Sequence, residues 1–141
     1  MRPIVADFTT AVGLSTGTTV DLRGCARAAA HLSLSAGGSV SLDFTVREWP
    51  ADGLSVTVMA APAALQEPER TMAMVEVAVN GRAVTRQAVS AEPVATPRDM
   101  VFAVPGKLLR AGANTVRLGN SEGPYPVLRL LRIVLAPATQ G

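Results

Sequence analysis

The chain has 141 residues, of which 48% are hydrophobic and 17% are charged, and its formal net charge is +2. This length suits one domain whose core is large enough to fold without disulfides or metal. The arginines are scattered along the chain, so the sequence lacks the basic stripe of a nucleic-acid-binding surface. The single cysteine excludes an internal disulfide.

Alternating apolar and polar residues predict β-strands along most of the chain. A weak first strand is indicated by PIVADF, followed by strands at TTVDL and AHLSLS. The alternation is clearest in SVSLDFTVRE and GLSVTVMA, and it returns in MVEVAVNG, DMVFAVP and NTVRLG. Each segment is bounded by Gly, Pro or Asn at the spacing of a β-sandwich. We therefore predict a single all-β, antiparallel β-sandwich domain over residues 1–141.

Several connections are predicted between these strands. The Asn80-Gly81 pair lies between VEVAV and RAV, and both residues tolerate the positive φ of a tight hairpin. Residues 36–39, Ala-Gly-Gly-Ser, are predicted to form a second hairpin, and residues 50–53 a third connection. Two proline-broken segments, 60–73 and 90–99, are predicted to be long loops, the first with room for one helical turn.

The stretch VFAVPGKLLRAGANTVRLGN separates two predicted strands by one short turn. Pro105 ends the first strand because proline has no N–H to donate to a neighbour. Residues 107–110 can close one helical turn, which places its two leucines under the edge of the sandwich as a plug. Gly112 supplies a left-handed exit from that turn, and Asn114 starts the next strand.

The segment VEVAVNGRAV…VFAVPGKLLRAGANTVRLGN resembles the galactose-binding-like β-jelly-roll domains attached to carbohydrate-active enzymes. It is similar to the carbohydrate-binding domains of rhamnogalacturonan lyases and to the sugar-binding jelly roll of β-galactosidases and β-glucuronidases. The match runs from Val75 to Leu118, and YPVLRLLRIVL would be the closing strand. The resemblance implies a jelly roll whose ligand sites lie in end loops, often including the loop before the final strand.

Sugar binding requires aromatic faces beside fixed polar groups, because the apolar side of a pyranose stacks on rings while its hydroxyls form hydrogen bonds. One ring is at the end of a strand, in REWPADG, and another lies in the loop GNSEGPYP. Alternatively, these two rings only cap the core and anchor the loop. The predicted ligand-binding residues are Trp49, Asn120, Glu122, Tyr125, Asp43, Arg47 and Arg129.

A polar stripe is predicted along one strand, where Asp43 and Arg47 point away from the apolar side chains. Arg117, and either Arg129 or Arg132, could join it from neighbouring strands. Guanidinium groups bind carboxylates through paired hydrogen bonds, so this face suits an anionic or hydroxylated ligand; the alternative is a solvated outer sheet. Arg129 and Arg132 are three residues apart, so one would enter the apolar face unless a bulge intervenes.

Few residues suggest catalysis. Cys25 lies between two arginines that could lower the pKa of its thiol, but a small buried residue is the more frequent role. His31, the only histidine, is expected on the polar face of its strand. Asp43 and Glu76 could form a catalytic pair at a suitable separation, or serve arginines as ion-pair partners. We assign no catalytic residue, metal or cofactor.

Together these features predict a non-catalytic carbohydrate-binding module, or a stand-alone relative. One alternative is a small intracellular enzyme or ligand-binding accessory protein of a bacterial biosynthetic pathway, with a pocket lined by arginines and carboxylates. A second is a structural domain for protein–protein assembly. The expected partner is a carbohydrate or small molecule, with neither nucleic acid nor membrane, and exposed edge strands allow a homodimer. No signal peptide is seen, which predicts a cytoplasmic protein, or a secreted one whose leader has been removed.

Overall fold

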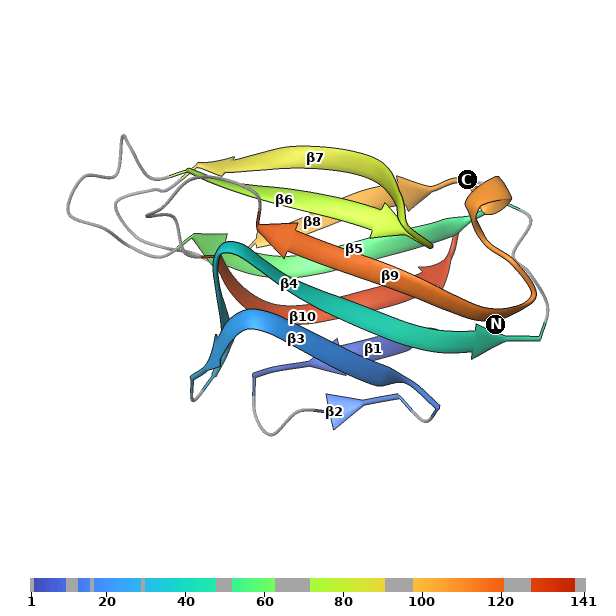
Figure 1. Ribbon diagram of the computed structural model, residues 1–141, viewed down its shortest axis with the longest axis horizontal. Helices are drawn as coiled ribbons and strands as arrows, with labels where there is room; N and C mark the ends of the chain where they lie inside the picture. Colours follow the sequence, from blue (N-terminus) through green and yellow to red (C-terminus); the bar gives the residue numbers. More distant parts are fainter. Residues whose placement is uncertain are drawn as a thin grey trace.

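The computed structural model is a sandwich of two antiparallel layers (Figure 1). It describes residues 2–9, 13–15, 17–28, 30–47, 52–62, 72–90, 98–120 and 128–138. Its elements are β1 (Ile4–Asp7), β2 (Gly13–Leu14), β3 (Thr19–Arg27), β4 (Leu32–Val46), β5 (Leu54–Pro62), β6 (Met72–Val79), β7 (Arg82–Ser90), β8 (Arg98–Val104), the 3-10 helix η2 (Gly106–Leu108), β9 (Gly112–Asn120) and β10 (Leu128–Pro137). Within these ranges, no helix is long and apolar enough to cross a membrane.

One layer has the strand order β3-β4-β9-β6-β7, and the other has the order β2-β1-β10-β5-β8. Strand β4 joins them, because it pairs with β10 in one layer and with β9 in the other. All strand pairs are antiparallel. The predicted all-β antiparallel sandwich is thereby confirmed.

The core lies between the layers and consists almost entirely of aliphatic side chains. The predicted alternation is confirmed in β4, where Val40, Leu42 and Phe44 are 0%, 1% and 3% exposed. Strands β5, β6 and β8 follow the same pattern with Leu54, Val56, Val58, Val75, Val77, Val79, Met100, Phe102 and Val104. Each fully buried aliphatic side chain contributes about 1.5–3 kcal/mol relative to its exposed state, so this alternation provides most of the driving force for closing the sandwich.

The predicted hairpin at residues 36–39 is wrong, because β4 continues from Leu32 to Val46 as one strand. Its first residues, Leu32–Leu34, pair with β10, and from Ser39 onward it pairs with β9. Strand β3 follows the same course, with its register shifting at Gly24. Both strands therefore bend together from one layer into the other.

Glycines make this bend possible. Gly24 has a φ of +63°, which side chains rarely allow. At Gly38 a Cβ would lie 2.6 Å from the carbonyl oxygen of Gly24 and 2.9 Å from that of Ser35. The two backbones thus approach each other so closely that no side chain fits between them.

We expect Gly38→Ala to lower the free energy of unfolding by about 3 kcal/mol or more, because its Cβ would collide with backbone atoms that cannot move independently. Gly37→Ala is the matched control: its φ is +78°, yet a Cβ added there would have no atom within 4 Å, so only the strain of about 1–2 kcal/mol applies. Urea denaturation measures both. Equal losses for the two variants would contradict the close approach at Gly38.

The Asn80-Gly81 hairpin is confirmed, with φ values of 51° and 84°. The turn after β8 is also present, as a 3-10 helix over Gly106–Leu108 that is shorter than the predicted turn and begins one residue earlier. Leu109 is only 3% exposed and so forms the predicted plug of the core. Gly112 has the left-handed φ expected of it, +93°.

A buried amide network attaches this turn to the hairpin. Asn114, 2% exposed, accepts a hydrogen bond from the side-chain amide of Asn80 at 2.9 Å. It also bonds both the backbone N–H and the carbonyl of Arg110, at 3.0 and 2.8 Å. Asn80 in turn donates to the carbonyl of Leu108 and accepts from the N–H of Thr115. The two asparagines satisfy backbone groups that the irregular turn leaves without strand partners.

We expect Asn114→Ala to lower the free energy of unfolding by about 2–4 kcal/mol, because it removes a buried side chain and leaves partly buried backbone groups of Arg110 without partners. Gln87→Ala, at an exposed position of β7, is the control and should change stability by less than about 0.5 kcal/mol. Thermal or chemical denaturation gives both values. A loss at Asn114 no larger than the control's would show that the network adds no stability.

The two predicted long loops are shorter than expected, because strands extend into them. Strand β5 continues to Pro62 and β6 begins at Met72, while β7 continues to Ser90 and β8 begins at Arg98. The residues between these strand ends, and residues 50–51 of the predicted third connection, lie outside the described residues.

Candidate functional site

A shallow depression lies on the outer face of the β3-β4-β9-β6-β7 layer, above the bend of β4. It has a volume of about 90 Å³. Its lining residues are Gly37, Gly38, Gly119, Asn120, Glu76, Ala78 and Arg117. Three glycines among them leave the backbone uncovered, so that a ligand can approach the strands directly.

Two opposite charges border this depression. Arg117 of β9 is exposed and pairs in register with Ala78 of β6. Glu76 is opposite Gly119 in the same ladder, and its carboxylate lies 3.7 Å from Nε of Arg86. Among the described residues, no acidic side chain forms an ion pair with Arg117. The depression therefore offers both a hydrogen-bond acceptor and a donor, as a hydroxylated ligand requires.

The predicted polar stripe continues from this depression along β4. Asp43 is exposed and lies beside Thr115 in the β4–β9 ladder, where its carboxylate accepts a hydrogen bond from the Thr115 hydroxyl. Arg117, two residues further along β9, is on the same outer face, as expected. The structure thus brings Asp43 and Arg117 onto one face, whereas Arg47 lies beyond the end of β4 beside a separate groove.

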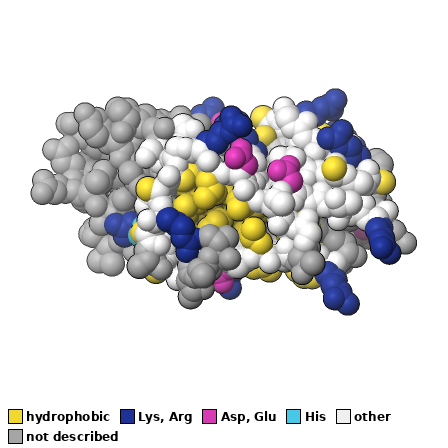
Figure 2. Space-filling view, turned by 60° about the horizontal axis from the view of Figure 1, so that its bottom comes forward, with side chains coloured by type: hydrophobic (Ala, Val, Ile, Leu, Met, Phe, Trp, Pro, Cys, Tyr) yellow, Lys and Arg dark blue, Asp and Glu magenta, His cyan; other side chains and the backbone are white. Residues whose placement is uncertain are grey.

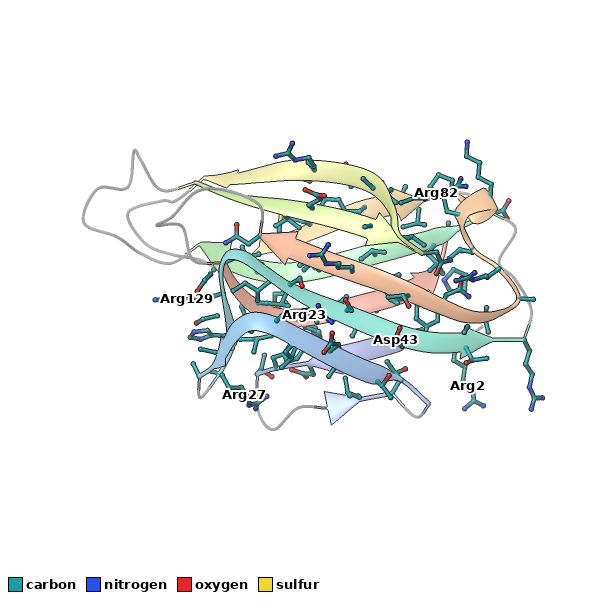
Figure 3. The ribbon with its side chains drawn as sticks, viewed as in Figure 1. Arg2, Arg23, Arg27, Asp43, Arg82 and Arg129 are labelled. Carbon is teal, nitrogen blue, oxygen red and sulfur yellow. The ribbon has the colours of Figure 1, made fainter. Side chains whose placement is uncertain are left out.

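Arg129 and Arg132 do not join this stripe, because both belong to β10 in the opposite layer. A β-bulge between Leu130 and Arg132 shifts the alternation, so that both arginines point away from the core. Figure 3 shows Arg129 well apart from Asp43. The sequence left open whether a bulge intervenes between these arginines, and the structure contains one. An interior pocket of arginines and carboxylates, the alternative considered from the sequence, does not form from these residues.

Asn120 lines the depression and also forms a structural hydrogen bond. Its side chain is 1% exposed, and its amide donates to the carbonyl of Leu34 at 3.1 Å. This bond attaches the end of β9 to the first part of β4. The chain then leaves β9 for residues 121–127, which contain two other predicted ligand residues, Glu122 and Tyr125. These two and Trp49 lie outside the described residues and stay predictions.

Strand glycines are the signal that could have revealed the depression from sequence. Gly37, Gly38 and Gly119 all lie inside strands, where glycine often marks a close approach of backbone or ligand. The sequence interpretation assigned the first two to a hairpin instead. For Gly119, nothing in the sequence indicates that it lies beside the other two glycines.

The strand register separates the two acids considered as a catalytic pair, because Asp43 lies opposite Thr115 of β9 and Glu76 lies opposite Gly119. Four of the described carboxylates have separate partners: Asp7 with Thr9, Asp21 with Arg23, Asp43 with Thr115, and Glu76 with Arg86. Hydrogen bonds from the hydroxyl and backbone N–H of Thr9 hold the pKa of Asp7 below its ordinary value. Among the described residues, no three His, Cys, Asp or Glu side chains gather to hold a metal.

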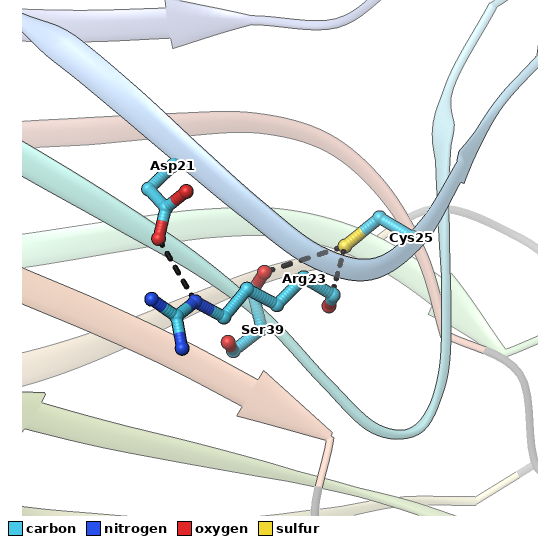
Figure 4. Close-up of polar contacts among 4 residues, drawn as sticks. All are labelled: Asp21, Arg23, Cys25 and Ser39. Atoms are coloured by element: carbon cyan, nitrogen blue, oxygen red, sulfur yellow. Dashed lines mark hydrogen bonds and ion pairs between the residues drawn. The ribbon is translucent and has the colours of Figure 1, made fainter.

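Cys25 is held as a thiol (Figure 4). Its Sγ donates to the carbonyl oxygens of Arg23 and Ser39 at 3.2 and 3.3 Å, and the Arg23 guanidinium turns away to Asp21 at 3.0 Å. Burial raises the pKa of the Cys25 thiol, although the two backbone contacts oppose this shift. The flanking arginines therefore do not activate this thiol, and the raised pKa agrees with the favoured interpretation of Cys25 as a small, partly buried residue. The imidazole of His31 lies 3.2 Å from the hydroxyl of Ser33.

We expect iodoacetamide to alkylate Cys25 several-fold more slowly in the folded chain than in the same chain unfolded in urea at pH 7.5. The raised pKa leaves less of the reactive thiolate at this pH, and partial burial limits access. Rates measured from pH 7 to 10 should give a higher apparent pKa for the folded form. A lower apparent pKa in the folded chain would instead indicate an activated nucleophile.

Comparison with known proteins gives a likeness of fold. No protein-family model matches the sequence, and no curated protein matches it. The structure is similar to the CBM36-1 domain of a multidomain xylanase from the hindgut metagenome of Trinervitermes trinervoides, with 11% identity, 99% of this chain and 100% of that chain covered, and a TM-score of 0.63. It is also similar to a carbohydrate-binding module CBM36 in complex with calcium and xylotriose, with 14% identity, coverage of 96% and 100%, and a TM-score of 0.62.

A third similar structure is the K1 cleaved adhesin domain of Lys-gingipain from Porphyromonas gingivalis W83, with 9% identity, coverage of 99% and 100%, and a TM-score of 0.62. The TM-scores establish a shared fold. At identities this low, function has to be inferred from the site itself. The chain has the β-sandwich fold of these modules over almost its whole length.

Proposed function

We propose that this chain is a non-catalytic carbohydrate-binding module that docks a glycan on the outer face of β4, β9 and β6. The observation that carries the proposal is the glycine-floored depression, where the Glu76 carboxylate and the Arg117 guanidinium border exposed backbone. The full-length likeness of fold to carbohydrate-binding modules, one of them in complex with xylotriose, supports it.

The chemistry of the depression suits a sugar edge. A hydroxyl group both donates and accepts, so Glu76 can accept one hydrogen bond while Arg117 donates another. Because glycines form the floor, the ring can come close enough for these bonds without displacing a side chain. The small volume admits one part of a sugar unit, so the remaining contacts would come from neighbouring residues. Trp49 and Tyr125 are proposed as the stacking surfaces.

We expect a glycan array to identify a ligand whose affinity falls about tenfold, or about 1.4 kcal/mol, in Glu76→Gln and in Arg117→Gln. Each substitution removes the charge that strengthens one hydrogen bond and leaves a polar amide in its place. Trp49→Ala and Tyr125→Ala should weaken binding further through lost stacking. Arg82→Gln, exposed on β7 outside the depression, is the matched control and should bind like the original chain. Calorimetry measures all five.

The fluorescence of Trp49, the only indole, provides an independent titration. A blank array together with unchanged fluorescence, in a chain whose circular dichroism shows intact β-structure, would contradict a glycan-binding role. If a glycan binds and neither Glu76→Gln nor Arg117→Gln weakens it, the chain is a glycan-binding protein whose site lies outside the depression.

A second candidate is an assembly domain, which one observation favours. Leu22 of β3 is 39% exposed although it lies opposite the core residue Val40 in the ladder. Figure 2 shows a hydrophobic area on this side of the molecule, bordered by basic and acidic side chains. Strand β3 is an edge strand that pairs only with β4 in the described structure, so it could add a further strand or a homodimer partner. The adhesin domain noted above shares the fold.

A further inference from the structure

A second hollow, of about 750 Å³, lies where β4 ends. No described residue lines both this groove and the depression above the bend of β4. Figure 3 shows Arg2 at this end of the molecule, near the end of β4 and far from Arg129. The groove has the size of pockets that hold drug-sized ligands, which is about 300–1,000 Å³.

Strand register creates the groove. The β3–β4 ladder begins at Thr19 opposite Asp43, so the last residues of β4 have β9 as their only strand neighbour in the described structure. In the other layer, the β1–β10 ladder starts only at Ile4. Phe44, a core residue that is 3% exposed, therefore reaches the groove and forms part of an apolar floor. On the side away from β9, the backbone of these last residues has no strand partner among the described residues.

Two arginines flank this floor. Arg2 and Arg47 are both exposed and both line the groove. Neither forms an ion pair within the described part of the chain, and none of the lining residues that the structure describes is acidic. Their charges are therefore not compensated in the groove, which favours an anion. A guanidinium fork matches the geometry of a carboxylate.

Hydroxyl groups also line the groove. Thr45 and Thr18 line the groove, as does Ser15, whose oxygen accepts the backbone N–H of Val5 at 2.8 Å and so keeps its own proton to donate. An apolar floor, several hydroxyls and two cations fit a ligand that combines a ring, hydroxyls and carboxylates. A bare inorganic anion would leave most of the volume and the floor unused.

We propose that this groove binds an oligosaccharide containing uronic acid, and that Arg2 and Arg47 form ion pairs with its carboxylates. The proposal rests on the proposed carbohydrate-binding role and adds to it a second site and a preference for acidic glycans. The ring packs against the floor at Phe44, and the hydroxyls bond Thr18, Thr45 and the free edge of β4.

The test is calorimetry of the full chain with trigalacturonic acid and with its neutral methyl ester. We expect the acid to bind at least tenfold more tightly than the ester, and its affinity to fall with added NaCl. Arg2→Gln and Arg47→Gln should each weaken binding of the acid, and the double variant should abolish it. Arg82→Gln removes the same charge from a position outside the groove and should leave the affinity unchanged. Circular dichroism checks that each variant folds.

Equal binding of acid and ester, no binding of the acid, or a double variant that binds like the original chain would each overturn the proposal. Competition by sulfate at the same molar concentration as the acid would reduce the groove to a general anion site and overturn it as well. Glu76→Gln separates the two sites: it should weaken a neutral glycan from the array and leave trigalacturonate unaffected. If the neutral glycan binds and trigalacturonate does not, only the groove proposal fails.

Discussion

The close contact between Gly24 and Gly38 is the constraint on which the rest of the sandwich depends. A Cβ at Gly38 would stand 2.6 Å from the Gly24 carbonyl oxygen, so the two strands can bend together only without side chains at this point. Through the bend, β4 pairs with β10 in one layer and with β9 in the other. One strand thus holds both layers, and the aliphatic core closes between them.

Both hollows on the surface are consequences of the course of β4. At its bend, the glycines that let the backbone turn also leave the floor of the depression bare. At its end, β4 extends past the first β3–β4 pair at Thr19 and Asp43, so its last residues border the groove. The hollows differ in charge: among the described lining residues, the depression has charges of both signs, whereas the groove has two arginines and no acid.

Three side-chain amides satisfy backbone groups, and one of them belongs to Asn120, a predicted ligand-binding residue. Asn80 and Asn114 fasten the 3-10 turn to the hairpin, and Asn120 bonds the carbonyl of Leu34. An all-β chain with irregular turns leaves backbone groups unpaired in its interior, and side-chain amides can supply both donor and acceptor there. At the depression, Asn120 is attached to β4 in this way, while the charges of Glu76 and Arg117 can meet a ligand.

Local sequence by itself determined the strands, the Asn80-Gly81 hairpin and the leucine turn, because alternation and left-handed glycines act over a few residues. It could not distinguish a hairpin at residues 36–39 from a bend in one strand, since glycines suit both and only pairing with β9 and β10 decides. Pairing with β5 likewise revealed the bulge that turns both arginines of β10 outward. Arg2 and Arg47 meet in one groove solely because the register of distant strands ends there.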